Sequence, residues 1–167
     1  NPYLSVAGYW AGTHTERGAA GDTASYRAFL NYSADRYGLQ LEHLTVEPGF
    51  DPQTGFVARR DQRKHLAAFR FSPRPTHASR IRKFTYRAAA TAIQNTAGRL
   101  ATRDLTGRFL VEFQNGDVFS AGADDNFDFL PAPFPIAPGV TIRPGAYEFR
   151  SGTIGYNVGR QRPLSGN

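Results

Sequence analysis

The chain has 167 residues, 40% of them hydrophobic, with 20 basic residues, 14 acidic residues and no cysteine. This length accommodates one domain, and the ordinary charge and aromatic content exclude a disordered chain. The lack of cysteine excludes disulfides, thiolate metal sites and cysteine nucleophiles. The formal net charge is +6, and all basic residues except Lys64 and Lys83 are arginine. Because the chain begins Asn1-Pro2 and contains no methionine, we expect a single domain, residues 1–167, taken from a larger protein.

Alternation of side-chain character predicts strands along most of the chain. The first strand is expected from Tyr3 to Ala11. The segment from Ser25 to Val46 predicts two strands around a tight turn at Asp35-Arg36, and a fourth strand is expected from about Gln62 to Ser72. The Ala-rich run 87–94 is too short for a helix and continues an alternating segment.

The second half of the chain predicts longer strands. The clearest pair covers 82–94 and 101–114, joined by a turn at 95–98. Asn115-Gly116 then predicts a type I′ hairpin turn, in which both central residues need positive φ. Further strands are expected over 117–128 and 147–158. About eight long strands joined mostly by short turns predict an all-β antiparallel meander, a barrel or part of a barrel.

Two connections are longer. Glu47 to Gly55 is too rich in Pro and Gly to pair as a ladder. Leu130 to Gly145 carries five prolines, each of which removes a backbone donor. We therefore expect the second segment to be an ordered surface excursion and not a pair of strands. Binding residues commonly lie in loops of this kind.

The faces of the central strands differ sharply in polarity. These strands are about 12 residues long or more, whereas about 5–6 is usual in soluble sandwiches. Outer-membrane barrels use strands of about 9–11 bilayer residues with apolar side chains outward and polar side chains inward. A soluble β-sandwich or flat sheet shares the alternation and is the alternative. If this sheet faces lipid, arginine at Val111 should cost about 2–4 kcal/mol near the bilayer midplane. The expected outward set is Phe109, Val111 and Phe113, and the expected inward set is Arg108, Glu112 and Gln114.

No pattern in the chain indicates catalysis, a cofactor or a metal. The histidines, at positions 14, 43, 65 and 77, form no HxH or HExxH pattern, so a zinc site is not expected. The segment from Asp124 to Asp128 imitates the start of a calcium loop, but Phe129 replaces the required Gly and Pro135 replaces the required Glu. Nucleophile-elbow, phosphate-loop and dinucleotide motifs are missing. We therefore expect a protein that is not an enzyme.

The arginines between Arg59 and Arg87 alternate with aromatic residues, which suggests binding of single-stranded nucleic acid by stacking. Period-two alternation places several of these arginines on the face opposite the aromatics, so we expect no nucleic-acid partner. Lining of a polar lumen, or cross-strand pairing with Asp104 and Glu112, explains the arginines more simply.

Three segments resemble one bacterial family. They are FDPQTGFVAR at 50–59, FRFSPRP at 69–75 and FPIAPGVTIRPGAYEF at 134–149. The chain resembles, from about Gly21 to its end, the large uncharacterised domain that follows a family-9-type carbohydrate-binding module in bacterial outer-membrane proteins. The resemblance implies an outer-membrane β-barrel-like domain linked to glycan or polymer handling, without catalytic residues to carry over.

The predicted function is a non-enzymatic β-barrel-type domain of the bacterial outer membrane or cell envelope, acting as a conduit or structural element. One alternative is a soluble or extracellular β-domain that binds glycan through the loop aromatics Phe50, Phe56, Phe134 and Tyr147. Another is a self-assembling, filament-forming protein, because the first strand carries no charge or proline from Tyr3 to Ala11. The expected partners are the lipid bilayer or copies of the chain. We expect the first and last strands either to close on each other or to pair with a neighbouring copy.

Overall fold

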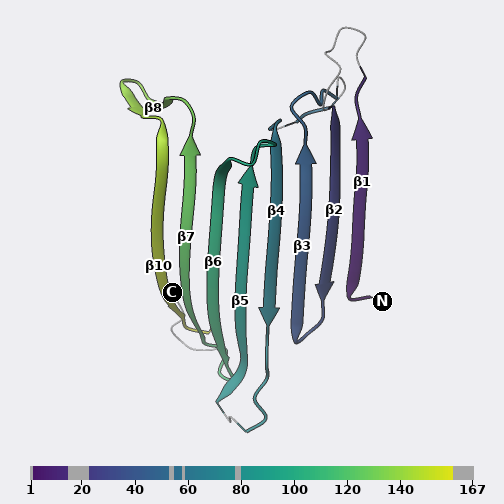
Figure 1. The fold of residues 1–167 in the computed structure, drawn as a ribbon. Helices are drawn as coiled ribbons and strands as arrows, with labels where there is room; N and C mark the ends of the chain where they lie inside the picture. The colour runs from purple at the N-terminus through teal and green to yellow at the C-terminus, as the bar shows by residue number, and fades with distance from the viewer. Residues whose placement is uncertain (1, 15–22, 53–54, 58, 78–79, 160–167) are drawn as a thin grey trace.

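The computed structural model describes residues 2–14, 23–52, 55–57, 59–77 and 80–159. Eight strands form one antiparallel sheet in the order β1-β2-β3-β4-β5-β6-β7-β10, and β8 and β9 form a separate hairpin (Figure 1). The predicted all-β meander is therefore confirmed. The strands are β1 Leu4–Gly12, β2 Ala24–Ser33, β3 Tyr37–Val46, β4 Gln62–Phe71, β5 Ile81–Gln94, β6 Leu100–Phe113, β7 Val118–Leu130, β8 Phe134–Ala137, β9 Val140–Ile142 and β10 Gly145–Asn157.

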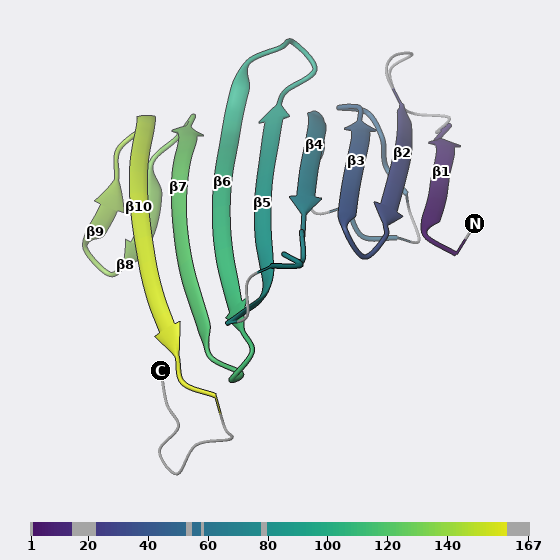
Figure 2. The ribbon, with the colours of Figure 1, turned by 90° about the horizontal axis from the view of Figure 1, so that it is seen from below.

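The sheet does not close into a barrel. Among the described residues β1 pairs only with β2 and β10 only with β7, and these two strands lie at opposite ends of the sheet (Figures 1 and 2). Of the two alternatives expected for the first and last strands, closure on each other is therefore wrong for this structure. No further described strand pairs with the outer side of β1 or β10, and open strand edges template pairing with further strands.

The cross-strand register divides the side chains into two sets. In β6, for example, Leu105, Phe109 and Val111 share one face with Ala90, Tyr86 and Phe84 of β5. We call this the apolar face, and the opposite face, which carries Arg108 and Asp104, the polar face. The predicted division of β6 follows this register for Phe109 and Val111 against Arg108 and Glu112. Phe113 pairs with Ile81 across a register shift, and Gln114 lies beyond the end of β6. Strict alternation produces the division, because successive side chains in a strand point to opposite faces.

The two turns at the ends of β6 use glycine in the same way. At Gly116, φ is +82°, and the Gly116 N–H donates to the Phe113 carbonyl at 3.1 Å, while the Phe113 N–H donates to the Asp117 carbonyl. Gly98, with φ of +85°, repeats this pattern between Asn95 and Arg99. These are three-residue loops with glycine in the left-handed region. The type I′ prediction at Asn115-Gly116 is wrong because the φ of Asn115 is not positive.

The proline segment departs from expectation. It leaves the sheet as an excursion, but β8 and β9 pair with each other within it, with Phe134 opposite Ile142 and Pro135 opposite Thr141. The prediction that no strand pair forms there is wrong. A two-stranded hairpin has two free edges, so the missing donor of a proline can point to solvent without breaking the ladder. The hairpin reverses at Gly139, where φ is +79°.

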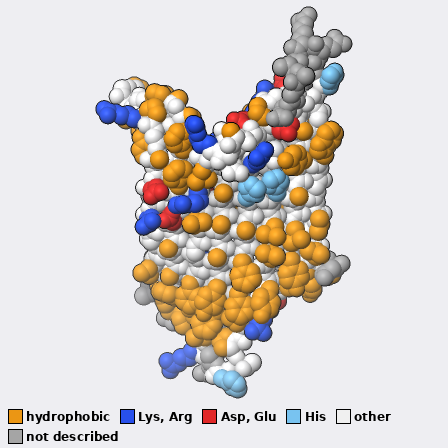
Figure 3. All heavy atoms as spheres, in the orientation of Figure 1, with side chains coloured by type: hydrophobic (Ala, Val, Ile, Leu, Met, Phe, Trp, Pro, Cys, Tyr) orange, Lys and Arg blue, Asp and Glu red, His pale blue; other side chains and the backbone are white. Residues whose placement is uncertain are grey.

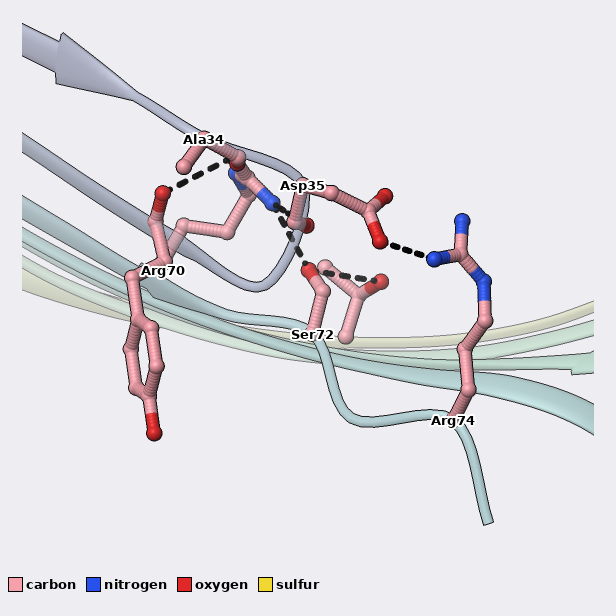
Figure 4. A network of polar contacts seen from close by, with 7 residues as sticks. Ala34, Asp35, Arg70, Ser72 and Arg74 are labelled. Atoms are coloured by element: carbon pink, nitrogen blue, oxygen red, sulfur yellow. Dashed lines mark hydrogen bonds and ion pairs between the residues drawn. The ribbon is translucent and has the colours of Figure 1, made fainter. Parts of the chain in front are cut away.

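Arg70 secures the tight turn between β2 and β3 (Figure 4). Its guanidinium donates to the backbone carbonyls of Ala34, Asp35 and Tyr37 and to the Ser72 hydroxyl. A second arginine, Arg74, forms an ion pair with the Asp35 carboxylate. The predicted turn at Asp35-Arg36 is confirmed, and β4 holds it from outside the hairpin.

Asp61 joins the loop before β4 to the turn between β5 and β6. It has a φ of +53°, and its carboxylate accepts hydrogen bonds from the Thr96 hydroxyl at 2.6 Å and the Thr96 N–H at 2.9 Å. These hydrogen bonds, led by that from the side chain, lower the pKa of Asp61 from its ordinary value near 3.8. Since the folded-state pKa is depressed, the bonds stabilise the fold above that value and are lost as the pH falls through the lower pKa.

The variant Asp61→Ala should therefore have an unfolding free energy about 1–2 kcal/mol lower than wild type at neutral pH. It loses the two hydrogen bonds and places an alanine at a positive φ. In Asp61→Asn, the asparagine tolerates positive φ and keeps an acceptor oxygen, so the loss of unfolding free energy should be less than half of that in Asp61→Ala. Urea unfolding at several pH values checks this, and the gap between wild type and Asp61→Ala should narrow below pH 3.8. A gap that widens on acidification would contradict the assignment.

Candidate functional surface

The apolar face extends across all eight strands of the sheet. One cross-strand row of it contains only apolar residues and glycine, from β1 to β10. Figure 3 looks onto this face and shows hydrophobic side chains spread across its whole width. The row consists of Leu4, Tyr32, Leu39, Phe69, Ala88, Gly107, Ala123 and Gly152.

Little of this face is covered. Only Val46, Phe50 and Val111 are buried hydrophobic residues among the described part of the chain. Large apolar side chains in the middle of the sheet remain open to solvent: Leu39 is 38% exposed, Leu41 42% and Phe69 49%. A stable soluble sheet buries one face against another layer, and no second layer is present among the described residues. Most of this face is therefore open to solvent in the part of the chain that the structure describes.

An aromatic row limits the apolar face at the end nearest the β2–β3 turn. Tyr37 stacks on Phe71 with ring centroids 5.2 Å apart, Phe71 is followed by Tyr86 at 6.2 Å, and Tyr86 by Phe109 at 5.0 Å. Phe119 extends the row to β7. The register of four successive antiparallel pairs brings these residues together. Rows of Tyr and Phe at one level of a sheet are typical of the water–lipid boundary.

Polar residues limit the same face at the opposite end. His43 and His65 are register partners with their Nδ1 atoms 3.3 Å apart. Toward β10, Asp125 binds Arg103 at 2.7 Å and Arg150 at 2.6 Å. These histidines and charged groups are visible at the middle and one side of the face in Figure 3. The apolar zone therefore lies between an aromatic boundary and a polar one.

The polar face carries paired charges of its own. Glu42 on β3 binds Arg27 of β2 at 2.7 Å and Lys64 of β4 at 3.2 Å. Asp124 on β7 accepts two hydrogen bonds from Arg108, at 2.7 and 2.9 Å. Cross-strand opposite charges of this kind stabilise a sheet only modestly when they are open to water. The face is suited to contact with water.

The arginine partners differ from those expected. Asp104 and Glu112 form no ion pair with any described residue, so the prediction that they pair with the arginines across strands is wrong. Within the stretch from Arg59 to Arg87, Arg60 binds Asp51 and Arg74 binds Asp35. Three further acceptors, Glu42, Asp124 and Asp125, bind arginines outside that stretch. Charge alternation alone could not have identified them, because the pairing of β6 with β7 sets which carboxylates lie opposite which arginines.

The four loop aromatics do not form one cluster. Phe50 and Phe56 belong to the connection between β3 and β4, whereas Phe134 and Tyr147 belong to β8 and β10, beyond β5, β6 and β7 in the sheet. Phe50 is buried, and Phe56 is 91% exposed. The hydroxyl of Tyr147 donates to the Arg143 carbonyl at 2.8 Å. They therefore offer no shared platform on which one glycan could stack.

Sequence reasoning also missed a buried carboxylate at the β6–β7 turn. Asp117 is 1% exposed, and it accepts hydrogen bonds from Asn115 Nδ2, the Tyr156 hydroxyl and the Gly159 N–H. Its place directly after Asn115-Gly116 was the available signal. Asp117 ties the turn to the end of β10.

Within the described ranges, no group of three or more His, Cys, Asp or Glu side chains is arranged to hold a metal ion. The described residues also include no helix long and apolar enough to cross a membrane. No family model, curated protein or solved structure matches this chain.

Proposed function

We propose that this sheet is the wall of a β-barrel-type domain in a bacterial outer membrane, with its apolar face toward lipid and its polar face toward water. The observation that carries the proposal is the uncovered apolar face, bounded by an aromatic row at one end and polar groups at the other. The resemblance of the loop motifs to an outer-membrane family points in the same direction. The role is structural or that of a conduit, without catalysis.

The dimensions of the apolar zone support this orientation. On β5 the apolar-face residues from Phe84 to Ala92 are aromatic or alanine throughout. Eight residues of antiparallel strand extend about 27 Å, and at a tilt of about 40° they span roughly 20 Å along the bilayer normal. Outer-membrane barrels carry an apolar band about 25 Å tall. The zone on β5 is thus close to the required height.

The Asp125 cluster lies at the polar limit of this zone. Both arginines have an ion-pair partner at hydrogen-bond distance, because the Asp125 carboxylate accepts from Arg103 and Arg150, and the cluster keeps one net positive charge. Long arginine side chains also reach toward the headgroup level. The cluster is therefore compatible with the boundary of a bilayer, although it would be costly at the midplane.

The open edges favour completion of the wall by additional strands. β1 carries no charged residue from Leu4 to Gly12, and β2 is its one partner among the described strands. Such an edge adds strands readily. Strands from elsewhere in a longer chain, or from a second copy, would close the structure, and the second case is the filament-forming alternative.

Sedimentation of the purified chain at micromolar concentration tests the proposal. Without detergent we expect large assemblies, since both the apolar face and the edges are exposed. With detergent we expect small, discrete particles that keep their β-sheet circular dichroism. A stable monomer in buffer without detergent would contradict the proposal. Large ordered fibrils that persist in detergent would support assembly through the edges instead.

A further inference from the structure

Three arginines face one another directly on the polar face. Arg70 of β4 is the register partner of Arg87 of β5, and Arg87 is the register partner of Arg108 of β6. Neighbouring strands lie about 4.8 Å apart, so the three side chains leave the backbone within about 10 Å. Like charges directly opposite one another destabilise a sheet. We propose that this arginine row binds the anionic group of a small phosphate- or sulfate-bearing solute, with Arg87 as the direct contact.

A glycine on the neighbouring strand leaves space for each of the two outer arginines. Gly38 is opposite Arg70, and a Cβ there would lie 3.1 Å from Arg70 Nε. Gly122 is opposite Arg108, and a Cβ there would lie 2.8 Å from Arg108 Cδ. Each glycine therefore leaves room for the neighbouring arginine to lie across the adjacent strand. Both guanidinium groups turn away from Arg87.

The charge of the row is only partly compensated. Arg108 binds Asp124, but Arg70 binds neutral carbonyl and hydroxyl oxygens only. The Arg87 guanidinium makes no hydrogen bond or ion pair with any residue that the structure describes. Among the described carboxylates, only Asp124 binds a member of this row, and it binds Arg108 alone. The local excess of positive charge attracts an anion.

A hollow of about 360 Å³ adjoins Arg87 on the polar face. Its base is formed by small residues, because Ala68 and Ala89 are register partners there. Asn31 and Gln40 add side-chain amides, and no carboxylate lines the hollow. The volume is at the lower end of the range for small-molecule sites, about 300–1,000 Å³. Arginine forms paired hydrogen bonds with phosphate oxygens, so both charge and donors favour an oxyanion over a neutral solute.

The polar face contacts water whether or not the opposite face contacts lipid, so this site does not depend on the proposed membrane role. Titration calorimetry with inorganic phosphate, on the detergent-dispersed chain at constant ionic strength set by sodium chloride, tests it. We expect saturable binding, weakened roughly tenfold or more in Arg87→Gln, since one charge-assisted contact is lost. Arg82→Gln, which removes the same charge from the same strand, should bind phosphate within about twofold of wild type.

Equal weakening in the two variants would show attraction by net charge alone and would overturn the site, as would a lack of saturable phosphate binding to the wild-type chain. Circular dichroism and urea unfolding without phosphate provide the check on folding. Arg87→Gln should be at least as stable as wild type there, because it relieves the repulsion within the row. A marked loss of stability would instead assign Arg87 a structural role and contradict the proposal.

Discussion

Arginine in place of Leu39 is expected to destabilise the bilayer-embedded sheet by about 2–4 kcal/mol, the cost of a lipid-facing charge near the midplane of a barrel. Leu39 lies in the entirely apolar row of the apolar face and is 38% exposed. In water the same substitution would be nearly neutral, because surface changes seldom exceed about 0.5 kcal/mol. The change in unfolding free energy therefore shows whether this face is in contact with hydrocarbon or with water.

Thr91→Arg is the control, because Thr91 of β5 points to the polar face and lies outside the arginine row and its hollow. We expect it to change the unfolding free energy by less than about 0.5 kcal/mol in the same vesicles. Reversible urea unfolding in lipid vesicles measures both variants. If the Leu39→Arg and Thr91→Arg variants were equally stable, the apolar face would not be in contact with hydrocarbon.

Val111 is a poorer position for this experiment than the sequence suggested. It is 7% exposed and lies between its register partners Phe84 and Phe119. Arginine there would be costly in any solvent, because it would disturb close packing. Leu39, in the middle of the sheet, is therefore a more informative position for the arginine substitution than Val111 near the end of β6.

The variant Asp117→Ala, which lacks the buried carboxylate, is expected to have an unfolding free energy about 3 kcal/mol lower than wild type. Three donors, from Asn115, Tyr156 and Gly159, would lose an acceptor that is 1% exposed. A buried donor left without a partner costs about 1–3 kcal/mol, and bonds to a charged acceptor are the stronger kind. Because the side chain is buried at a turn, this cost is expected in detergent and in bilayers alike.

Tyr156→Phe provides a graded comparison, since it removes one of the three donors and should cost about 1 kcal/mol. Asp117→Asn keeps one acceptor oxygen and should fall between the two variants. Urea unfolding in detergent micelles measures the series. If Asp117→Ala were no less stable than Tyr156→Phe, the carboxylate would not organise the β6–β7 turn as described.

The strand order and faces were accessible from sequence because both follow from local rules. The period of two in β5 and β6 is uninterrupted, and short turns force neighbouring strands to pair. The segment from Ser25 to Val46 showed its two strands and its turn in the same way. Confirmation of the meander therefore rests on strong local signals.

The ion pairs and the arginine row were not accessible in this way. Which carboxylate meets Arg103 or Arg108 depends on the register between β6 and β7, and the three-residue loop at Gly116 sets that register. A two-residue type I′ turn at Asn115-Gly116 would have shifted the pairing. In the proline segment, free hairpin edges relaxed the rule against proline, which holds for interior strands.

The most direct test of the lipid-facing sheet moves the one tryptophan of the chain to Val6, which is 71% exposed and is the register partner of Leu30 inside the apolar zone. The fluorescence of this double variant, Val6→Trp, Trp10→Phe, is measured in vesicles of lipids with brominated acyl chains. The comparison is the double variant Ala7→Trp, Trp10→Phe, whose indole lies one residue further along the strand and therefore on the polar face. We expect strong quenching of the first variant and little quenching of the second. Equal quenching of the two proteins, or stronger quenching of the second, would contradict contact between the apolar face and lipid.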